Sequence, residues 1–315
     1  MRSMRVAQNP RTELCHSGYL ISAAVSAGGG IRLDPAVHVG VPLVETGQRS
    51  YAVDLQDSSG AYDQSSLAAC DIYFKRGYVR ADVPAAYREK VRPFGLNYSC
   101  RTLRSLVKVL SLYGRRRMAP RRWKDYVLSP PPEAFEVPPA EAYEAKVLFQ
   151  TRIWPLEERN AEHNPEEING FRIEMLRELR RAFGKRFVGG LIPTEEAGAY
   201  PELITHMPSR RRDYAAWSRP PAIGVYTRGV LGSNAFKVAE YLAGSKCIVG
   251  QSLAHELPQP LGECHSARET VEATVAECDA LLSNPARLES ARRASWNYYQ
   301  SQLRFDRRMA LLLGG

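Results

Sequence analysis

The second half of the chain alternates short apolar runs with segments of helical spacing, and this alternation constrains the fold more than any other feature. The apolar runs predict strands at residues 146–151, 187–192, 222–226 and 247–249. Helical spacing covers residues 165–182, 235–243, 267–282, 285–298 and 300–313. Strands and helices in alternation predict a parallel sheet covered on both faces, as in a Rossmann-like α/β domain. Such sheets bind ligands beyond the carboxyl ends of their strands.

The first 130 residues predict a second, smaller α/β domain. Its strand-like runs lie at residues 31–33, 37–44, 50–55, 71–73 and 90–92, and helical spacing is clearest at residues 101–112. Prolines then cluster at residues 120, 130–132 and 138–139. Proline removes a backbone donor and restricts the residue before it, so this stretch is predicted to be extended. We therefore predict an N-terminal domain at 1–130, a linker at 131–145 and the larger Rossmann-like domain at 146–298.

The composition excludes a disordered tail and a chain that crosses a membrane. Hydrophobic residues make up 44% of the 315 residues, while the apolar runs stay well below the roughly 18 residues of a membrane helix. An apolar stretch at residues 19–27, after Arg2 and Arg5, has the form of a secretory leader, although Glu13 weakens that match. The six cysteines are scattered without zinc-site spacing, which indicates reduced thiols. We expect a cytoplasmic protein, with secretion as the alternative.

Most of the positive charge is local. The net charge is +9, and residues 101–130 hold nine Lys+Arg against one Asp+Glu. Such a segment could bind nucleic acid, an anionic membrane surface at the inner face of the membrane or a phosphorylated ligand, and a solvated interdomain segment is the alternative. The membrane contact is predicted for the arginines Arg115, Arg116, Arg117, Arg121 and Arg122. No zinc finger, heptad repeat or ribonucleoprotein motif accompanies the segment, so nucleic acid is not the expected partner.

Residues 223–250 carry the most specific signal for a binding site. A predicted strand ends at Thr227, a loop with Gly229 and Gly232 follows, and Ser233 or Asn234 can cap the next helix. Glycines allow a close backbone approach, and the free N–H groups at a helix start attract phosphate. On that helix, Lys237 and Glu240 are three residues apart. Their spacing alone fits a surface ion pair as well as a ribose and phosphate site.

Residues 234–250, NAFKVAEYLAGSKCIVG, resemble the nucleotide-sugar-binding element of bacterial glycosyltransferases of the group 1 type. Members of that family have the GT-B architecture of two Rossmann-like domains, and this helix carries a Lys-x-x-Glu-Tyr pattern. Here Lys237, Glu240 and Tyr241 stand at matching positions, Lys246 follows, and Ser245 occupies a position where the family has glycine. The resemblance implies an α/β chain of GT-B type with an abbreviated N-terminal domain, and a closing helix at 299–315 that crosses back to that domain.

The resemblance also implies a donor site for a nucleotide sugar. Glu240 would bind the ribose, and Arg152, after the strand at 146–151, would contact the diphosphate. Together with the loop after the strand at 222–226, the predicted donor-binding set is Arg152, Thr227, Gly229, Ser233, Asn234, Lys237 and Glu240. No Asp-x-Asp motif is present, so we expect neither a metal ion nor another cofactor. Many relatives have a second glutamate eight residues before the helix glutamate, where this chain has Gly232.

The acceptor, expected to be a glycan, a lipid-linked or a small molecule, requires a general base if its hydroxyl is to be activated. Carboxylates at strand ends of the first domain are the candidates, and these are Asp54, Asp57 and Asp71. Turn formation and helix capping account for the same residues without catalysis. Two alternatives to a glycosyltransferase therefore stay open: a non-catalytic nucleotide- or glycan-binding protein, and a basic binder of nucleic acid or membranes through residues 101–130.

Overall fold

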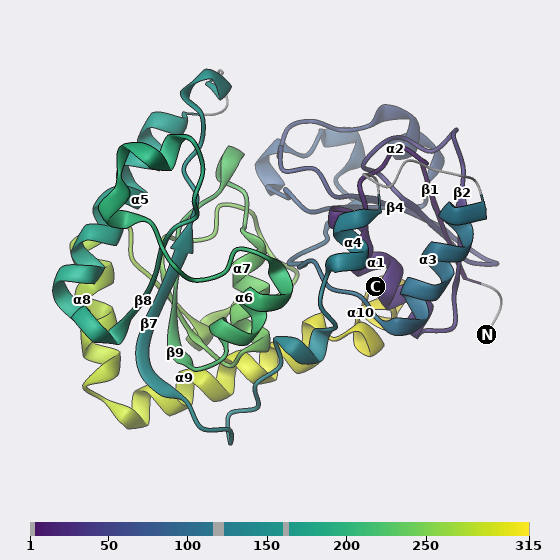
Figure 1. Cartoon of the computed structure of the whole chain (residues 1–315). Coiled ribbons are helices and arrows are strands. Elements are labelled where there is room, and N and C mark those ends of the chain that lie inside the picture. Colours follow the sequence, from purple (N-terminus) through teal and green to yellow (C-terminus); the bar gives the residue numbers. More distant parts are fainter. Residues whose placement is uncertain (1–3, 116–122, 160–163, 315) are drawn as a thin grey trace. The chain divides into compact units, whose positions relative to one another are not determined.

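The chain folds into two α/β units (Figure 1). The computed structural model describes residues 4–115, 123–159 and 164–314. One unit combines residues 1–132, 255–260 and 300–315, and the other combines residues 133–254 and 261–299. Each unit is built on its own sheet, so the predicted α/β class with two sheet-based domains is confirmed. Within the described residues, no helix is long and apolar enough to span a membrane.

The N-terminal unit has a six-stranded sheet in the order β2-β1-β3-β4-β5-β6. Its strands are β1 (Arg5–Gln8), β2 (Gly30–Leu33), β3 (Leu43–Glu45), β4 (Ser50–Asp54), β5 (Ile72–Lys75) and β6 (Val91–Pro93). Strand β3 runs antiparallel to both of its neighbours, whereas the other neighbouring strands pair in parallel. The sheet is therefore mixed, and β1 was not predicted from the sequence.

Helix α1 is the central helix of this unit. The unit's helices are α1 (Leu14–Ser26), α2 (Gln64–Ala69), α3 (Leu103–Arg115), α4 (Lys124–Leu128) and α10 (Phe305–Gly314). The apolar stretch at residues 19–27 lies largely in α1, which is buried along most of its length. Its Tyr19 hydroxyl donates to the Leu303 carbonyl, and the Tyr19 ring packs 5.3 Å from the Phe305 ring. The apolar character of this stretch thus serves a packed helix, which links the C-terminal segment to the N-terminal unit.

The C-terminal unit has a five-stranded parallel sheet in the order β11-β10-β9-β7-β8. Its strands are β7 (Glu144–Thr151), β8 (Phe187–Leu191), β9 (Pro221–Tyr226), β10 (Cys247–Gly250) and β11 (His265–Ala267). Counted along the chain, this order is 2-1-3-4-5, the doubly wound arrangement of flavodoxin-like sheets. The four predicted strands are confirmed, while β11 was missed because it has only three residues of mixed polarity.

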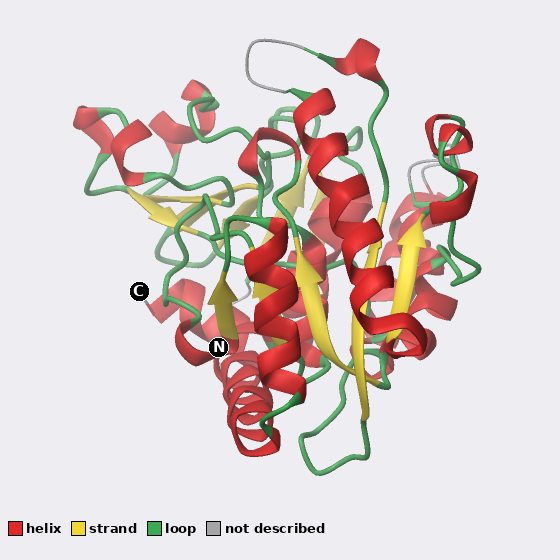
Figure 2. Ribbon diagram, turned by 90° about the vertical axis from the view of Figure 1, so that its left-hand side faces the viewer, coloured by secondary structure: helices red, strands yellow, loops and turns green. Residues whose placement is uncertain are grey.

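Helices cover both faces of this sheet. They are α5 (Pro165–Phe183), α6 (Arg211–Ser218), α7 (Phe236–Ala243), α8 (Val271–Leu282) and α9 (Pro285–Tyr298). Helices α5 and α8 pack against each other on one face, which is turned toward the viewer in Figure 2, and α7 and α9 pack on the other. Gly224 in β9 is needed for this packing, because a Cβ there would lie 2.5 Å from the Tyr241 ring of α7. The two helical layers leave the strand ends as the open edges of the unit.

The segment predicted as a linker packs against the C-terminal unit. Phe135 and Val137 are buried, the Val137 N–H donates to the Ala243 carbonyl at 3.0 Å, and the Ser245 hydroxyl donates to the Val137 carbonyl. Ser245 has a φ of 48°, a left-handed conformation that favours glycine. This left-handed backbone explains why the family that residues 234–250 resemble has a glycine at that position. Here a hydrogen bond from the serine side chain accompanies the strained backbone.

Candidate functional site

The two central strands of the C-terminal sheet define its topological switch point. Strand β7 pairs with β9 in parallel, and the chain leaves β7 toward β8 on one side and leaves β9 toward β10 on the other. Open α/β sheets bind ligands in the crevice beyond the carboxyl ends of the strands at such a point. The residues that follow these two strands are Arg152 and Thr227, both predicted as donor-binding residues.

Arg172 of α5 forms hydrogen bonds to both loops at the switch point, the one after β7 and the one after β9. Its guanidinium donates to the Arg152 carbonyl at 2.7 Å, the Arg228 carbonyl at 3.0 Å and the Thr227 hydroxyl at 3.2 Å. Arg172 is only 6% exposed, and burial, together with nearby Arg152, lowers its pKa to about 10. Among the described residues, no carboxylate forms an ion pair with it. A buried guanidinium without an acidic partner favours an anion at this place.

Arg152 places a second guanidinium at the same point. Its side chain is exposed and lies 4.1 Å from the centre of the Trp154 ring. Asn169 of α5 anchors this loop in both directions: its amide oxygen accepts from the Trp154 N–H and its amide nitrogen donates to the Trp154 carbonyl, each at 2.8 Å. In the described part of the chain, no carboxylate pairs with the Arg152 guanidinium. Arg152 is therefore positioned and available for an anionic ligand.

The loop after β9 is compact because Gly229 allows it to be. The Gly229 N–H donates to the Ser233 carbonyl at 3.0 Å, and a Cβ at Gly229 would lie 2.5 Å from the Ser233 hydroxyl. Leu231 and Gly232 both have positive φ values, 57° and 69°. A cavity of about 270 Å³ opens beside this loop, lined by Thr227, Arg228, Gly229, Gln251 and residues of α5. The loop thus forms one wall of a concave site at the strand ends.

The start of α7 differs from the prediction. The residue at the N-cap position is Ala235, which makes no side-chain cap hydrogen bond, and not Ser233 or Asn234. Ser233 and Asn234 are both buried in the preceding loop. The leading N–H groups of an α-helix carry a partial positive charge, and an anion stabilises them where a side chain does not. The start of α7 therefore adds to the positive field at the strand ends.

Lys237 and Glu240 lie in a cluster between α6 and α7. The Lys237 ammonium lies 3.8 Å from the centre of the Tyr214 ring, and burial lowers the pKa of Lys237 to about 8. Glu240 is buried, and its carboxylate lies 3.5 Å from the guanidinium of Arg211. The pair predicted at three-residue spacing is thus completed by Arg211 and Tyr214 of α6. A ribose hydroxyl that binds Glu240 would have to share it with Arg211.

Lys246, the last match to the family pattern, lies at the opposite edge of the sheet. It is buried, and its ammonium donates to the carbonyl of Pro221, the first residue of β9, at 2.6 Å and to the Arg219 carbonyl at 3.1 Å. Arg219 is the C-cap of α6, so Lys246 satisfies a carbonyl at a helix end. Its role in this structure is to join α6, β9 and β10, far from any ligand at the carboxyl edge.

Lys246 makes the stability of the fold depend on pH. Burial, with Arg292 and Arg219 nearby, lowers its pKa from the ordinary 10.5 to about 7. Between these values the unfolded chain binds a proton that the folded chain does not, so stability should rise with pH across this window. Lys246→Met should flatten the rise in the free energy of unfolding between about pH 7 and 9, measured by urea denaturation. The control Lys185→Met, at an exposed lysine, should keep the wild-type slope.

The predicted base Asp54 is occupied in a buried ion pair. Its carboxylate lies 2.8 Å from the Lys75 ammonium, and both side chains are wholly buried. It also accepts from the Tyr73 hydroxyl at 2.8 Å and from the Gln56 N–H at 2.9 Å. The pairing follows from the register of the parallel strands, in which Asp54 stands opposite Lys75. This geometry favours a structural role over a catalytic one.

The other two predicted bases lie at different edges of the same sheet. Asp57 follows β4, is partly exposed and pairs with the Arg76 guanidinium, which also donates to Asn97 at 3.0 Å. Asp71 precedes β5, and its carboxylate accepts from the Ser50 N–H at 2.7 Å at the start of β4. The Ser50 hydrogen bonds lower the pKa of Asp71. Asp71 thus lies at the amino edge and Asp57 at the carboxyl edge, where ligands of α/β sheets bind.

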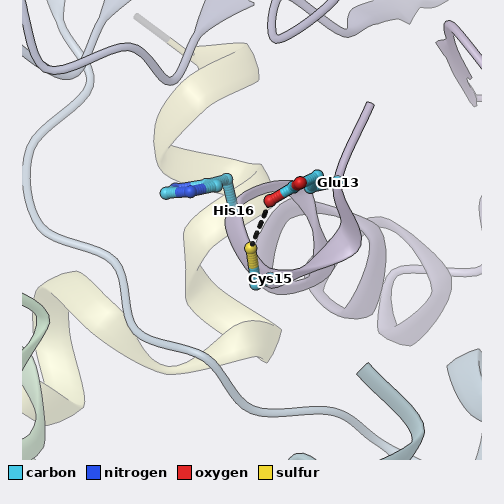
Figure 3. Close-up of side chains that lie close together, drawn as sticks. All are labelled: Glu13, Cys15 and His16. Carbon is cyan, nitrogen blue, oxygen red and sulfur yellow. Dashed lines mark hydrogen bonds between the residues drawn. The ribbon is translucent and has the colours of Figure 1, made fainter. Parts of the chain in front are cut away.

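Three potential metal ligands meet at the start of α1 (Figure 3). The ligand atoms of Glu13, Cys15 and His16 lie within 4.8 Å of one another. The Cys15 thiol donates to the Glu13 carboxylate at 3.6 Å, and the His16 ring extends away from that pair. These are residue types that zinc prefers, but all three lie within one stretch of four residues, and no fourth ligand from the described part of the chain joins them. The expectation of a metal-independent protein stays a prediction.

Of the arginines predicted to contact a membrane, only the backbone of Arg115 belongs to the described residues. Arg116, Arg117, Arg121 and Arg122 lie outside the described residues, and the side chain of Arg115 is not described either.

No family model matches the chain, and no curated protein matches it by sequence. Among solved structures, the chain is similar to HepE from Anabaena in complex with UDP, with a TM-score of 0.44, 8% identity and coverage of 94% of this chain and 75% of that chain. The chain is also similar to the S. aureus MnaA–UDP structure, with a TM-score of 0.41, 10% identity and coverage of 98% of this chain and 74% of that chain. A third similar structure is the C-terminal domain of a glycosyl transferase group 1 family protein from Francisella tularensis. Its TM-score is 0.36 and its identity 9%, and the match covers 54% of this chain and 96% of that chain. All three TM-scores lie below 0.5, and the three identities are 10% or lower.

The site contains residues that the sequence interpretation missed, above all Arg172, Asn169 and Arg211. A signal for Arg172 was present: it stands four residues after Ile168 and four before Leu176, on the apolar stripe of its helix. A charged residue on such a stripe must be hydrogen-bonded or paired when buried. Nothing comparable marks Arg211, because its contact with Glu240 depends on how α6 packs beside α7.

Proposed function

We propose that this chain is a metal-independent glycosyltransferase whose C-terminal unit binds a nucleotide-sugar donor. The observation that carries the proposal is the pair of guanidinium groups, Arg152 and Arg172, at the switch point of a doubly wound sheet. Neither has a carboxylate partner among the described residues, and both belong to the loops or helix that border the strand ends. Two fixed positive groups beside an open edge favour a diphosphate. The sequence pattern of α7 adds the resemblance to nucleotide-sugar enzymes.

The proposed chemistry uses this positive field. When the sugar leaves a nucleotide donor, negative charge develops on the diphosphate, and fixed positive groups stabilise it without reorganisation. Arg152 and the start of α7 would contact the diphosphate, while Arg172 would hold the two loops in register. Glu240 would accept hydrogen bonds from the ribose hydroxyls. A cytoplasmic glycan, lipid-linked or small-molecule acceptor would then receive the sugar.

Nucleotide binding is the first test of this proposal. Thermal unfolding should be followed with UDP, GDP, TDP, CMP and ADP, and with NAD as a negative control. One nucleoside diphosphate should raise the apparent stability, by about 2.7 kcal/mol at one hundred times its dissociation constant. Glu240→Ala should remove most of this shift, whereas Glu174→Ala, at an exposed position of α5, should keep it. A shift that survives Glu240→Ala unchanged would argue against the proposed ribose contact.

A non-catalytic nucleotide-binding protein is the second candidate, because of Gly232. The family glutamate that Gly232 replaces is absent, and the backbone here has a φ of 69°, which a glutamate would adopt only with strain. The loop is therefore built for glycine. Tight nucleotide binding without any release of nucleoside diphosphate from nucleotide sugars, in the presence of a broad set of glycan and lipid acceptors, would favour this candidate.

A further inference from the structure

Helix α3 is held in one orientation by a polar buried face. Ser105, Val109 and Tyr113 are wholly buried at spacings of four residues. The Ser105 hydroxyl lies 3.0 Å from that of Ser22 in α1 and accepts from the Tyr126 hydroxyl at 2.6 Å. The Tyr113 hydroxyl accepts from the Gln8 amide. These contacts fix which side of α3 faces the N-terminal unit.

The opposite side of α3 exposes an apolar stripe. Leu103 is 72% exposed, Val107 59% and Leu110 39%. Their spacing of four and three residues places them on one face of the helix. A buried helix face normally collects such side chains, yet here the buried face contains a serine and a tyrosine hydroxyl. Three large aliphatic side chains on one exposed face mark an interaction surface.

Basic side chains border this stripe on one side. At 100° per residue, Arg104 and Lys108 lie between the apolar stripe and the buried face. Arg104 is exposed, and the Lys108 ammonium donates to the Gly29 carbonyl at 2.7 Å. The sequence from 101 to 130 holds nine basic residues against one acidic residue. An apolar stripe flanked by basic residues is the pattern of a helix that lies in a membrane interface.

We propose that the exposed face of α3, formed by Leu103, Val107, Leu110 and Arg104, docks on an anionic lipid bilayer. The aliphatic side chains would enter the boundary between headgroups and acyl chains, and the basic side chains would meet the anionic headgroups. A nucleic acid would use the charges but not the aliphatic stripe. A second copy of the chain would bring the same positive charge against itself, which disfavours self-association.

Vesicle co-sedimentation of the full chain tests this proposal. The probe is a vesicle of phosphatidylcholine with about 30% phosphatidylglycerol, compared with pure phosphatidylcholine. The chain should bind the anionic vesicle and bind the neutral one much more weakly. The double variant Leu103→Ser/Val107→Ser, which adds no charge, should lower the partition coefficient at least ~10-fold, because each aliphatic side chain contributes through its apolar area. Arg104→Gln should lower it by ~5-fold, the effect of one basic side chain near an anionic surface.

The matched control is Leu311→Ser, at a leucine of α10 that is 43% exposed, and it should bind as wild type does. Thermal unfolding of each variant verifies that it is folded. Absence of binding to the anionic vesicle would overturn the proposal. Binding that the double serine variant leaves unchanged would also overturn it, and would indicate charge attraction alone. A wild-type dimer in size-exclusion chromatography that the double variant dissociates, without vesicle binding, would assign the face to self-association instead.

Discussion

Arg172→Met should weaken nucleoside diphosphate binding by at least ~10-fold, the effect of removing one positive charge and one loop anchor. The loops after β7 and β9 share this guanidinium, which donates to the Arg152 and Arg228 carbonyls. Methionine fills the space but donates nothing, so both loops lose their common donor. Isothermal titration with the nucleotide that gives the largest thermal shift measures the effect.

Arg172→Lys separates charge from geometry. Lysine keeps the positive charge beside Arg152 but offers no planar fork for three acceptors. Affinity should recover in part, and its salt dependence should return toward that of wild type, since the charge is restored. A merely structural role would lower stability in both variants and leave the affinity of the folded fraction unchanged. That result, with urea denaturation as the parallel measurement, would remove Arg172 from the proposed site.

Breaking the ion pair between Asp54 and Lys75 should cost the N-terminal unit about 3–5 kcal/mol, because the remaining charge would be buried without a partner. Asp54→Ala leaves the Lys75 ammonium with the Ala61 carbonyl at 2.7 Å and the Tyr62 ring at 4.6 Å. The double variant Asp54→Leu/Lys75→Met removes both charges and should recover most of the lost stability. Urea denaturation of the two single variants and the double variant measures the coupling.

The same variants decide whether Asp54 acts as a base. If its role is structural, the double variant should retain nucleotide binding and sugar transfer at close to wild-type levels. A double variant that is as stable as wild type but loses transfer by several orders of magnitude would restore Asp54 as the catalytic candidate. Asp57, the predicted base that follows β4 and is partly exposed, is then the next residue to test in the same assay.

The strands of the C-terminal unit were predictable because each is a short apolar run followed by turn residues. Residues 147–151 of β7 and all of β9 are buried on both faces, so these sequences do not alternate between polar and apolar residues. Helix α1 was missed although it too is buried on nearly every side, because a buried helix lacks the amphipathic pattern from which a helix is predicted. The three residues of β3 do not indicate that it runs antiparallel, because the direction of a strand depends on the strands with which it pairs.

The sequence predicted only those residues of the candidate site that directly follow a strand. Arg152 and Thr227 directly follow strands, so the topology alone brings them to one edge. The partners of Arg172 and Glu240 depend on packing between helices and loops, which residue spacing does not contain. Asp71 is instructive, because it precedes its strand and therefore lies at the amino edge, a consequence of strand direction that was available from the sequence. The burial of Asp54 against Lys75 required the register of β4 and β5.

The central claim is that the switch point of the C-terminal sheet holds the diphosphate of a nucleotide sugar. A crystal structure of the chain with the nucleoside diphosphate that gives the largest thermal shift tests this claim most directly. We expect the diphosphate beyond the carboxyl ends of β7 and β9, in hydrogen-bond contact with the Arg152 guanidinium and beside the start of α7. A nucleotide bound at any other place, with this edge of the sheet empty, would contradict the account.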